Sequence, residues 1–267
     1  GSVKSLPLAE VSDHVPPRDL SRYVGGHPMA GSERSGPLAA SAELFGGRPW
    51  AITPDVHADP DAVRVVEHLA SLCGALPVRL SPVEHDRAVA RTSHVPHLLA
   101  VLTAAQLRDA VPEHLTLSGQ GVRDVTRVAA GDPDLYGQII RANGPAVVEL
   151  LNGVRADLAD LIEAIEAPDA EPLTDVLQRG VDGTRSIPAK HGGPVLDTTI
   201  VQVTVSDTPG ELARLLREVG DIGVNIEDLR IDHDPGRATG LAELTVTAHS
   251  AEGLRDALTA RGWVTHR

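Results

Sequence analysis

Three stretches of the sequence carry side chains that could transfer a proton or bind a carboxylate. Residues 25–36 read GGHPMAGSERSG, with one histidine among small residues, and residues 91–100 read RTSHVPHLLA, with two histidines three apart. Residues 121–136 read GVRDVTRVAAGDPDLY, with two arginines four apart. An imidazole with a pKa near neutrality can act as a base at working pH. A guanidinium can pair bidentately with a planar carboxylate, which lysine cannot do.

Plainer interpretations apply to each of these residues when it is taken alone. A single histidine in a loop, such as His27, is usually solvated, and so is an arginine on a helix surface, such as Arg127. Two histidines three apart share a helix face and could bind a metal ion. That reading fails for His94 and His97 because further ligands are lacking and Pro96 distorts the turn between them. No metal site is expected.

The composition excludes several classes of protein. The 267 residues include 24 Lys and Arg against 37 Asp and Glu, a net charge of -13, and no basic patch that would favour a nucleic-acid partner. No apolar run of about 18 residues suggests a membrane span. The one cysteine, Cys73, cannot form an intrachain disulfide and is expected to be a buried apolar residue. These features favour a cytoplasmic protein without a signal peptide.

The first part of the chain has the pattern of an α/β layer. Residues 49–53 and 76–80 are short apolar strands, and between them Val63, Val66 and Leu69 recur at helical spacing. A self-contained dinucleotide domain would also contain a Gly-rich turn of the type G-x-G-x-x-G. The 267 residues contain no such turn, so we expect them by themselves to bind a dinucleotide weakly.

A helical region is predicted to follow from Ser81. Ser81, a proline after it and Glu84 form the pattern of a capping box, which begins a helix. Pro96 predicts a kink or break, and a second helix is expected over about residues 124–143. A third helix begins near Ala146 and carries an apolar stripe that suits a bundle or a dimer interface. The stripe consists of Val147, Leu151, Val154, Leu158, Leu161 and Ile165.

A separate C-terminal unit is predicted after a linker. Residues 180–194 are dense in glycine and proline, which marks a domain boundary. Beyond them the pattern runs strand, helix, strand, strand, helix, strand, with a second capping-box pattern at Thr208 to Glu211. This order predicts a small α+β ferredoxin-like unit.

The three motifs, in this order, resemble the active-site signature of the prephenate dehydrogenase family of tyrosine biosynthesis. The resemblance implies an α/β remnant of a Rossmann-type domain over residues 1–80, lacking the N-terminal part of the nucleotide-binding domain. An all-α substrate and dimerisation domain over residues 81–187 and an α+β ferredoxin-like ACT domain over residues 198–267 would follow. The implied reaction is oxidative decarboxylation of prephenate to 4-hydroxyphenylpyruvate with a nicotinamide cofactor.

By this resemblance His27 is the catalytic base, which takes the proton of the substrate's C4 hydroxyl while C4 releases a hydride. Ser2 matches a serine that orients this histidine, an assignment that fails if Gly1 and Ser2 were left by cloning. Arg127 matches the arginine that grips a substrate carboxylate. Arg123 stands where many relatives have a basic residue at the mouth of the pocket.

The remaining substrate contacts follow from the same resemblance. His97 corresponds to a histidine that contacts the substrate, with Ser93 close to it. Glu33 resembles an acidic residue that gates the entrance. Tyr136 stands where relatives often have tryptophan, a departure that leaves its contact with the substrate open.

The C-terminal unit resembles an ACT domain, an amino-acid sensor, over residues 207–226. In that family the ligand lies between paired domains, near the loop after the first strand and the start of the second. Gly210 would let the backbone approach the ligand, and Asn225 offers a donor and an acceptor; Asp207 and Ile226 flank them. The resemblance implies a homodimer that is feedback-regulated by tyrosine.

Several alternatives stay open at this point. NAD is the expected cofactor, with NADP not excluded, and no residue decides between prephenate and arogenate as substrate. The chain could instead be a non-catalytic fragment that binds an amino acid and dimerises, in which case tyrosine would bind and the cofactor would not. It could also be a structural dimer module that binds neither.

Overall fold

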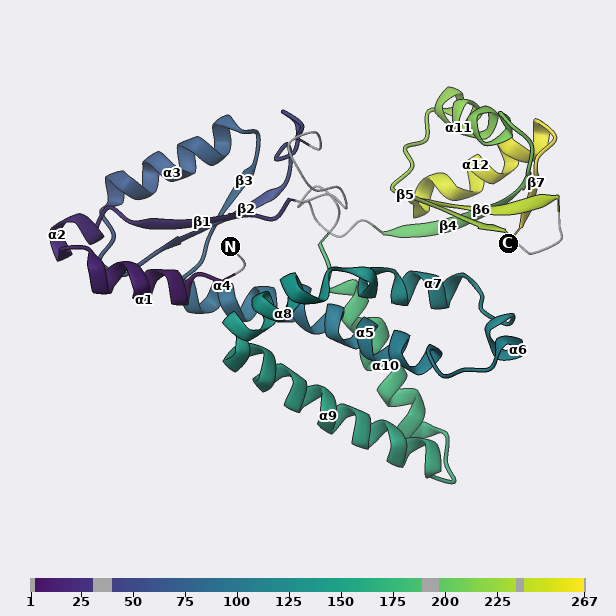
Figure 1. The fold of residues 1–267 in the computed structure, drawn as a ribbon. Helices are drawn as coiled ribbons and strands as arrows, with labels where there is room; N and C mark the ends of the chain where they lie inside the picture. Colours follow the sequence, from purple (N-terminus) through teal and green to yellow (C-terminus); the bar gives the residue numbers. More distant parts are fainter. Residues whose placement is uncertain (1–2, 31–39, 189–196, 234–237, 267) are drawn as a thin grey trace. The chain divides into compact units, whose positions relative to one another are not determined.

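The structure, a computed structural model, describes residues 3–30, 40–188, 197–233 and 238–266. The chain divides into two compact units, Gly1–Ala170 and Glu171–Arg267, and each is described by itself (Figure 1). Within the described ranges, no helix is both long enough and apolar enough to cross a membrane.

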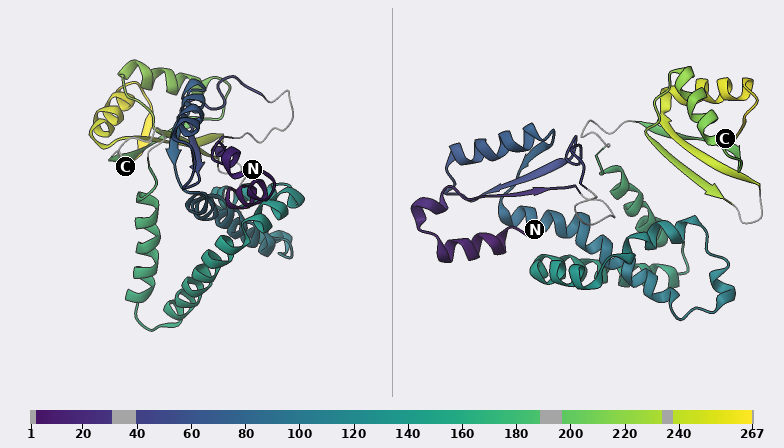
Figure 2. Two further views of the ribbon diagram at one scale, coloured as in Figure 1. Left: turned by 90° about the vertical axis from the view of Figure 1, so that its left-hand side faces the viewer. Right: turned by 45° about the horizontal axis from the view of Figure 1, so that its top comes forward.

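The first unit opens with a three-stranded sheet and its helices. These elements are α1 (Ser5–His14), α2 (Pro17–Leu20), β1 (Val24–Pro28), β2 (Pro49–Pro54), α3 (Pro60–Leu72) and β3 (Leu76–Arg79). The strand order is β1-β2-β3, with β1 antiparallel and β3 parallel to β2. The two strands and the helix that the sequence predicts here are confirmed. Figures 1 and 2 show α3 over one face of the sheet and α1 along the other.

The register of the sheet decides where His27 points. Ile52 on β2 is fully buried against Val63 of α3, and neighbouring residues on a strand face opposite sides. Ala51, opposite His27 in the β1–β2 ladder, therefore faces away from α3, and residues paired across a ladder share a face. His27 thus lies on a strand rather than in a loop, on the face away from α3. Cys73, at the end of α3, is half-buried rather than buried.

The helical region begins as the sequence predicts. In α4 (Pro82–Val89), Ser81 Oγ accepts the N–H of Glu84 at 3.2 Å, and the Glu84 carboxylate accepts the N–H of Ser81 at 3.0 Å, which confirms the capping box. The chain continues through a π-helix, η2 (Ala90–His94), into α5 (Val95–Leu107). Pro96 has no N–H for the carbonyl four residues earlier, so the turn before it widens. The expected distortion at Pro96 is confirmed.

The single helix expected over residues 124–143 is wrong. The structure has α6 (Pro112–Leu115), α7 (Gln120–Thr126), the 3-10 helix η3 (Arg127–Ala130) and α8 (Pro133–Ala142). Asp132 caps α8 by accepting the N–H of Asp134 at 2.9 Å, and Pro133 occupies the first helical position. This pair begins a new helix, so the previous one ends at Ala130.

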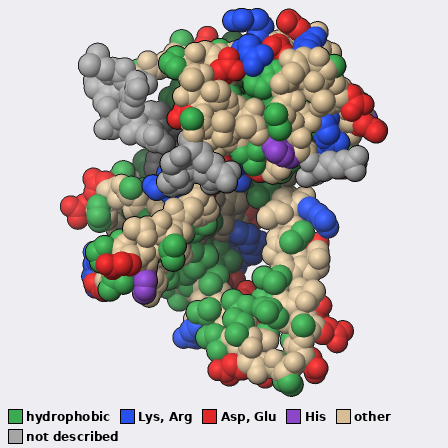
Figure 3. Space-filling model, turned by 90° about the vertical axis from the view of Figure 1, so that its right-hand side faces the viewer, with side chains coloured by type: hydrophobic (Ala, Val, Ile, Leu, Met, Phe, Trp, Pro, Cys, Tyr) green, Lys and Arg blue, Asp and Glu red, His purple; other side chains and the backbone are tan. Residues whose placement is uncertain are grey.

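Helix α9 (Gly144–Glu166) carries the predicted apolar stripe, but of the stripe residues only Val147 is fully buried within the chain. Val147 is 2% exposed and packs on Ala90 and Val95. Leu158 and Ile165, farther along, are 53% and 61% exposed. Figure 3 shows hydrophobic side chains gathered at the bottom of the view.

The second unit begins with α10 (Glu171–Arg185), which corrects the predicted start of the linker at Gly180. Gly180 and Gly183 lie inside this helix. A side-chain hydrogen bond from Gln178 to Asp182 (2.9 Å) spans that turn, and Asp182 also pairs with Arg185. Such pairs at helical spacing offset part of the cost of the glycines.

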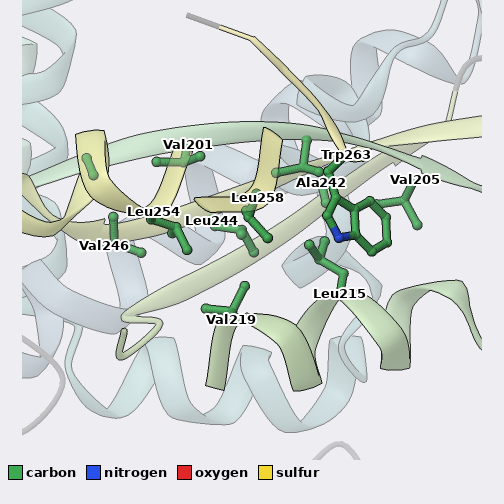
Figure 4. Packing of buried hydrophobic residues seen from close by; sticks show 12 residues of the cluster. Val201, Val205, Leu215, Val219, Ala242, Leu244, Val246, Leu254, Leu258 and Trp263 are labelled. Atoms are coloured by element: carbon green, nitrogen blue, oxygen red, sulfur yellow. The ribbon is translucent and has the colours of Figure 1, made fainter. Parts of the chain in front are cut away.

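The rest of the second unit has the predicted order of strands and helices. It consists of β4 (Thr198–Ser206), α11 (Glu211–Ile222), β5 (Asp228–His233), β6 (Thr239–Thr247), α12 (Ala248–Ala260) and β7 (Val264–His266). The antiparallel sheet has the order β5-β6-β4-β7, a ferredoxin-like arrangement. The two helices cover one face, and their core includes Val201, Leu215, Leu244, Leu254 and Trp263 (Figure 4).

The capping box expected ahead of α11 is wrong. The helix begins after Gly210, which has φ +96° and offers no side chain to cap it. The Thr208 hydroxyl bonds to Ser206 (3.3 Å) instead, and the Glu211 carboxylate accepts from Arg214 at 2.8 Å. Both side chains that would form the box are therefore engaged elsewhere.

Candidate active site

A row of hydrogen-bonded polar groups in the first unit runs from His27 through His85 to Asp86. The Nδ1 atom of His27 lies 2.9 Å from Nε2 of His85 on α4, and Nδ1 of His85 lies 2.9 Å from Oδ1 of Asp86. The Asp86 carboxylate also accepts the backbone N–H groups of Lys4 (2.7 Å) and Ser5 (2.9 Å). Three segments that are distant in sequence, β1, α4 and the start of α1, thus meet at one row of hydrogen bonds.

The ionisation of these groups suits a base. Burial, followed by the positive charge of Lys4 nearby, lowers the pKa of His27 from 6.5 to about 4. Burial also lowers the pKa of His85, and this effect is larger than the opposite effect of its hydrogen bond to Asp86. Burial works against ionised Asp86, yet hydrogen bonds from His85 and Ser5 outweigh it and lower the pKa of its carboxyl. At neutral pH both imidazoles are neutral and Asp86 is charged.

This charge state gives a pH-dependent expectation. The ring resonances of His27 should titrate with a midpoint about 4 instead of 6.5. Because the unfolded chain binds this proton near 6.5, lowering the pH from 6.5 toward 4 should reduce the free energy of unfolding, and His85 acts in the same direction. NMR titration and urea unfolding at several pH values measure the two effects. A midpoint at 6.5 would contradict the buried environment.

A second buried network supports α4 from the helical side. Asn143, between α8 and α9, is 4% exposed, and its amide donates to the main-chain oxygen of Asp86 at 2.7 Å. The same amide lies 3.2 Å from Nδ1 of His94. Burial lowers the pKa of His94, which lies within electrostatic reach of both His27 and His97. The segments of His27, His94 and His97 therefore border one region.

His97 and Tyr136 form a stacked pair at this region. Their ring centroids are 3.6 Å apart and the planes differ by 6°. His97 is 7% exposed, and its Nδ1 atom is buried with no hydrogen-bond partner within the described ranges. A buried nitrogen without a partner is costly unless a ligand or water supplies one.

Gly131 makes the stacked pair possible. A Cβ atom there would lie 2.5 Å from Cε2 of Tyr136 and 3.4 Å from Cε1 of His97. We expect Gly131→Ala to displace the tyrosine ring and to lower the free energy of unfolding by roughly 1–3 kcal/mol. Gly137→Ala is the matched control, since no atom lies within 4 Å of its Cβ position. In a helix interior that change should stabilise by roughly 0.5–1 kcal/mol. Equal urea midpoints for the two variants would contradict the contact.

Of the other residues predicted to act at the site, three are exposed and two lie outside the described residues. Arg127 begins η3, which packs against α5, and both Arg127 and Arg123 are exposed. Ser93 is exposed on the π-helix η2. Ser2 and Glu33 lie outside the described residues.

The residues of the predicted amino-acid site in the second unit lie at two different ends of the sheet within one chain. Asp207 donates its N–H to Ala238 beside the start of β6, whereas Glu227, two residues after Asn225, donates to Thr245 near the end of β6. The six residue-to-residue steps from 239 to 245 along this strand span roughly 20 Å. One chain therefore places Asp207 and Gly210 at one end of the sheet, and Asn225 and Ile226 at the other.

Sequence reasoning missed His85, Asp86, Lys4 and Asn143. The available signal was the pair of adjacent polar residues, His85 and Asp86, directly inside a firmly predicted helix start. Both are buried, at 1% and 7% exposure. Polar residues at buried positions next to a predicted active-site histidine are candidates for a network.

A dinucleotide needs a cradle for its pyrophosphate and a place for its reacting ring. The neutral, half-buried imidazole of His27 fits the proton half of a hydride transfer. Arg127 on η3 and Arg123 on α7 carry the positive charge that binding an anionic substrate would require. The Gly-rich phosphate turn does not occur in the 267 residues, so these residues fit the reacting end of the cofactor only.

Family models match most of the first unit and part of the second. Residues 1–78 match the model described as "Prephenate dehydrogenase, nucleotide-binding domain", and residues 81–179 match "Prephenate dehydrogenase, dimerization domain". Over 257 residues the chain is 37% identical to a Streptomyces niveus protein named "Probable prephenate dehydrogenase NovF". This alignment covers 92% of this chain and 71% of the relative.

Solved structures give the same grouping. A prephenate dehydrogenase from Aquifex aeolicus, in complex with hydroxyphenyl propionate and NAD+, is similar with a TM-score of 0.62 and 28% identity, over 69% of this chain and 64% of that one. A Synechocystis arogenate dehydrogenase is similar with a TM-score of 0.59 and 28% identity, over 70% and 68% of the two chains.

Proposed function

Because this chain belongs to the prephenate dehydrogenase family, we propose that its first unit carries out the oxidative decarboxylation of prephenate to 4-hydroxyphenylpyruvate with NAD. The observation that carries the proposal is the half-buried His27, neutral at working pH because its pKa is about 4. Its Nδ1 is already bonded to His85 at 2.9 Å. Such an imidazole is held ready to accept a proton on its other nitrogen.

His27 takes the proton of the C4 hydroxyl as the hydride leaves C4, so that the C4–O bond becomes a carbonyl. When bound, the nicotinamide ring supplies the acceptor for that hydride. The bond from the ring to its carboxylate then breaks, carbon dioxide leaves, and the electron pair makes the ring aromatic. His27 returns its proton to the phenolate oxygen. No net proton is produced, so His27 acts first as base and then as acid.

Other residues bind and orient the substrate in this proposal. Arg127 pairs with a substrate carboxylate, and Arg123 adds positive charge at the mouth of the pocket. The buried Nδ1 of His97 gains a partner on the substrate, and Tyr136, stacked on His97, closes that side. Ser93 lies on the preceding π-helix turn. Ser2, which would orient His27, and Glu33, which would gate the entrance, belong to the proposal on the family resemblance alone.

The test is an assay of all four combinations of prephenate or arogenate with NAD or NADP. It uses the protein as its gene encodes it and, in parallel, residues 1–267 alone. The expected result is reduction of NAD with prephenate by the gene-encoded protein. Turnover only with arogenate would assign the activity of the Synechocystis relative instead. Absence of turnover with retained tyrosine binding would replace catalysis by a binding and dimerisation role.

The exposed half of α9 supports a homodimer. Leu158 and Ile165 are more than half exposed on a helix inside the range that matches the dimerization-domain model. Ile165→Glu should therefore dissociate the dimer in sedimentation velocity without unfolding the chain. Asp160→Lys, a charge change 200° around the helix from Leu158 at 3.6 residues per turn, is the control. Dimers of Ile165→Glu would place the interface elsewhere.

We further propose that the second unit is an ACT domain that binds tyrosine between two copies of the chain. Two observations support this proposal, the ferredoxin-like strand order and the separation of Asp207 and Gly210 from Asn225 and Ile226. Two copies can bring opposite ends together, whereas one cannot. Calorimetry should show tyrosine binding that weakens in Asn225→Ala while the dimer persists. Undiminished binding would exclude this site. A cytoplasmic location remains a prediction.

A further inference from the structure

We infer that His85 and Asp86 are positioning residues which, with the N-terminus of helix α1, fix the nitrogen of His27 that carries its proton. The hydrogen-bond geometry of the described residues carries this inference by itself. Its consequence for the rate rests on the function proposed above.

Only one arrangement of protons satisfies the row of hydrogen bonds. The ionised Asp86 has no proton to give and accepts from Lys4 and Ser5 at 2.7 and 2.9 Å. His85 Nδ1, at 2.9 Å, must therefore donate to Asp86. Neutral His85 then has a bare Nε2, so His27 Nδ1 must donate to it across 2.9 Å. His27 Nε2 is left without a proton and is the atom that can act as a base.

Asp86 is fixed from two directions. The first N–H groups of a helix have no partner within it and form the positive end of its dipole. In α1 (Ser5–His14) no side chain of the preceding residue, Lys4, caps the helix. Asp86 takes that place from 81 residues away, and its main-chain oxygen is held by Asn143 at 2.7 Å. The helix end thus keeps the carboxylate charged and aimed at His85.

The same row stabilises the charged state that the reaction passes through. When His27 takes the substrate proton, its ring becomes positive while buried, which is costly without a nearby negative charge. The carboxylate of Asp86, one ring away, offsets that charge until the proton returns to the product. This role needs no proton to reach Asp86, and none leaves the site.

The first test measures the tautomer directly and needs neither cofactor nor turnover. Nitrogen-15 NMR of residues 1–267 labelled at histidine distinguishes a protonated from a bare ring nitrogen. At neutral pH we expect His27 and His85 to carry the proton on Nδ1, with both Nε2 atoms bare. A proton on Nε2 of His27 would overturn the inference, whatever the chain catalyses.

The second test changes Asp86 to Asn in the gene-encoded protein. The NH2 group of asparagine would face either the backbone N–H donors of Lys4 and Ser5 or the Nδ1–H of His85. If it faces His85, Nδ1 of His85 can accept from it and Nε2 of His85 can donate to Nδ1 of His27. The proton of His27 would then lie on Nε2. We expect kcat to fall roughly 10²- to 10⁴-fold with KM little changed, and the NMR signature of His27 to switch. Asp109→Asn, at a side chain 76% exposed, is the matched control.

The outcomes separate this inference from the proposed function. Normal kcat in a folded Asp86→Asn protein would overturn the positioning role and leave the activity intact. If the wild type shows no turnover, the function fails while the NMR result still decides the tautomer. Should Asp86→Asn fail to fold, the wild-type NMR spectrum remains decisive.

Discussion

His27→Asn is expected to lower kcat roughly 10²- to 10⁴-fold, the usual contribution of a general base. Asparagine can still donate a hydrogen bond to His85, so the row from His85 to Asp86 keeps its partner. It cannot take a proton, so the loss should appear in kcat and leave KM for prephenate nearly unchanged. Steady-state rates of NAD reduction measure both constants.

His57→Asn is the control for His27→Asn. His57→Asn replaces a histidine in the loop after β2, far along the strand from His27, and should leave both constants unchanged. If His27→Asn raised KM and kept kcat, the histidine would bind the substrate without taking its proton. The base would then have to be sought among other residues.

Arg127→Lys is expected to raise KM for prephenate roughly 10- to 100-fold. Hydrogen bonds to charged groups contribute about 1.5–3 kcal/mol, and lysine keeps the charge while losing the planar fork. Since the carboxylate is held in both the ground state and the transition state, kcat should change little. Initial rates over a range of prephenate concentrations, at fixed NAD, measure the effect.

Arg141→Lys on α8, also exposed, is the matched control for this change and should have no effect. Arg123→Lys should raise KM less than Arg127→Lys does, because point charge rather than geometry matters at the mouth of the pocket. Loss of kcat at unchanged KM in Arg127→Lys would show that the arginine acts on the reacting atoms instead.

The elements that the sequence predicts correctly are those with local causes. Ser81 and Glu84 form their capping box within one turn, and Pro96 widens the turn directly before it. The helix expected over residues 124–143 was wrong because its apolar periodicity continues through Asp132 and Pro133, although these residues begin a new helix. The cap at Asp132 and the proline after it caused the break, although the apolar periodicity alone predicted a continuous helix.

The contacts within the candidate site, in contrast, could not be predicted from the sequence. His27 could be identified from its surrounding motif, but its partner His85 is 58 residues away, and Asp86 is 82 residues from Lys4. No periodicity or spacing relates these residues before the sheet and α4 come together. Tyr136 can stack on His97 because Gly131 has no side chain at the place where the tyrosine ring lies. A sequence motif does not reveal this contact.

Deuterium placed at C4 of prephenate tests the proposed reaction directly. With NAD and the gene-encoded protein, the reaction proposed for His27 predicts one deuterium in each reduced nicotinamide, one carbon dioxide for each NAD reduced, and 4-hydroxyphenylpyruvate as product. An aromatic product that keeps the deuterium, or one that forms without reduction of NAD, would contradict the proposed function.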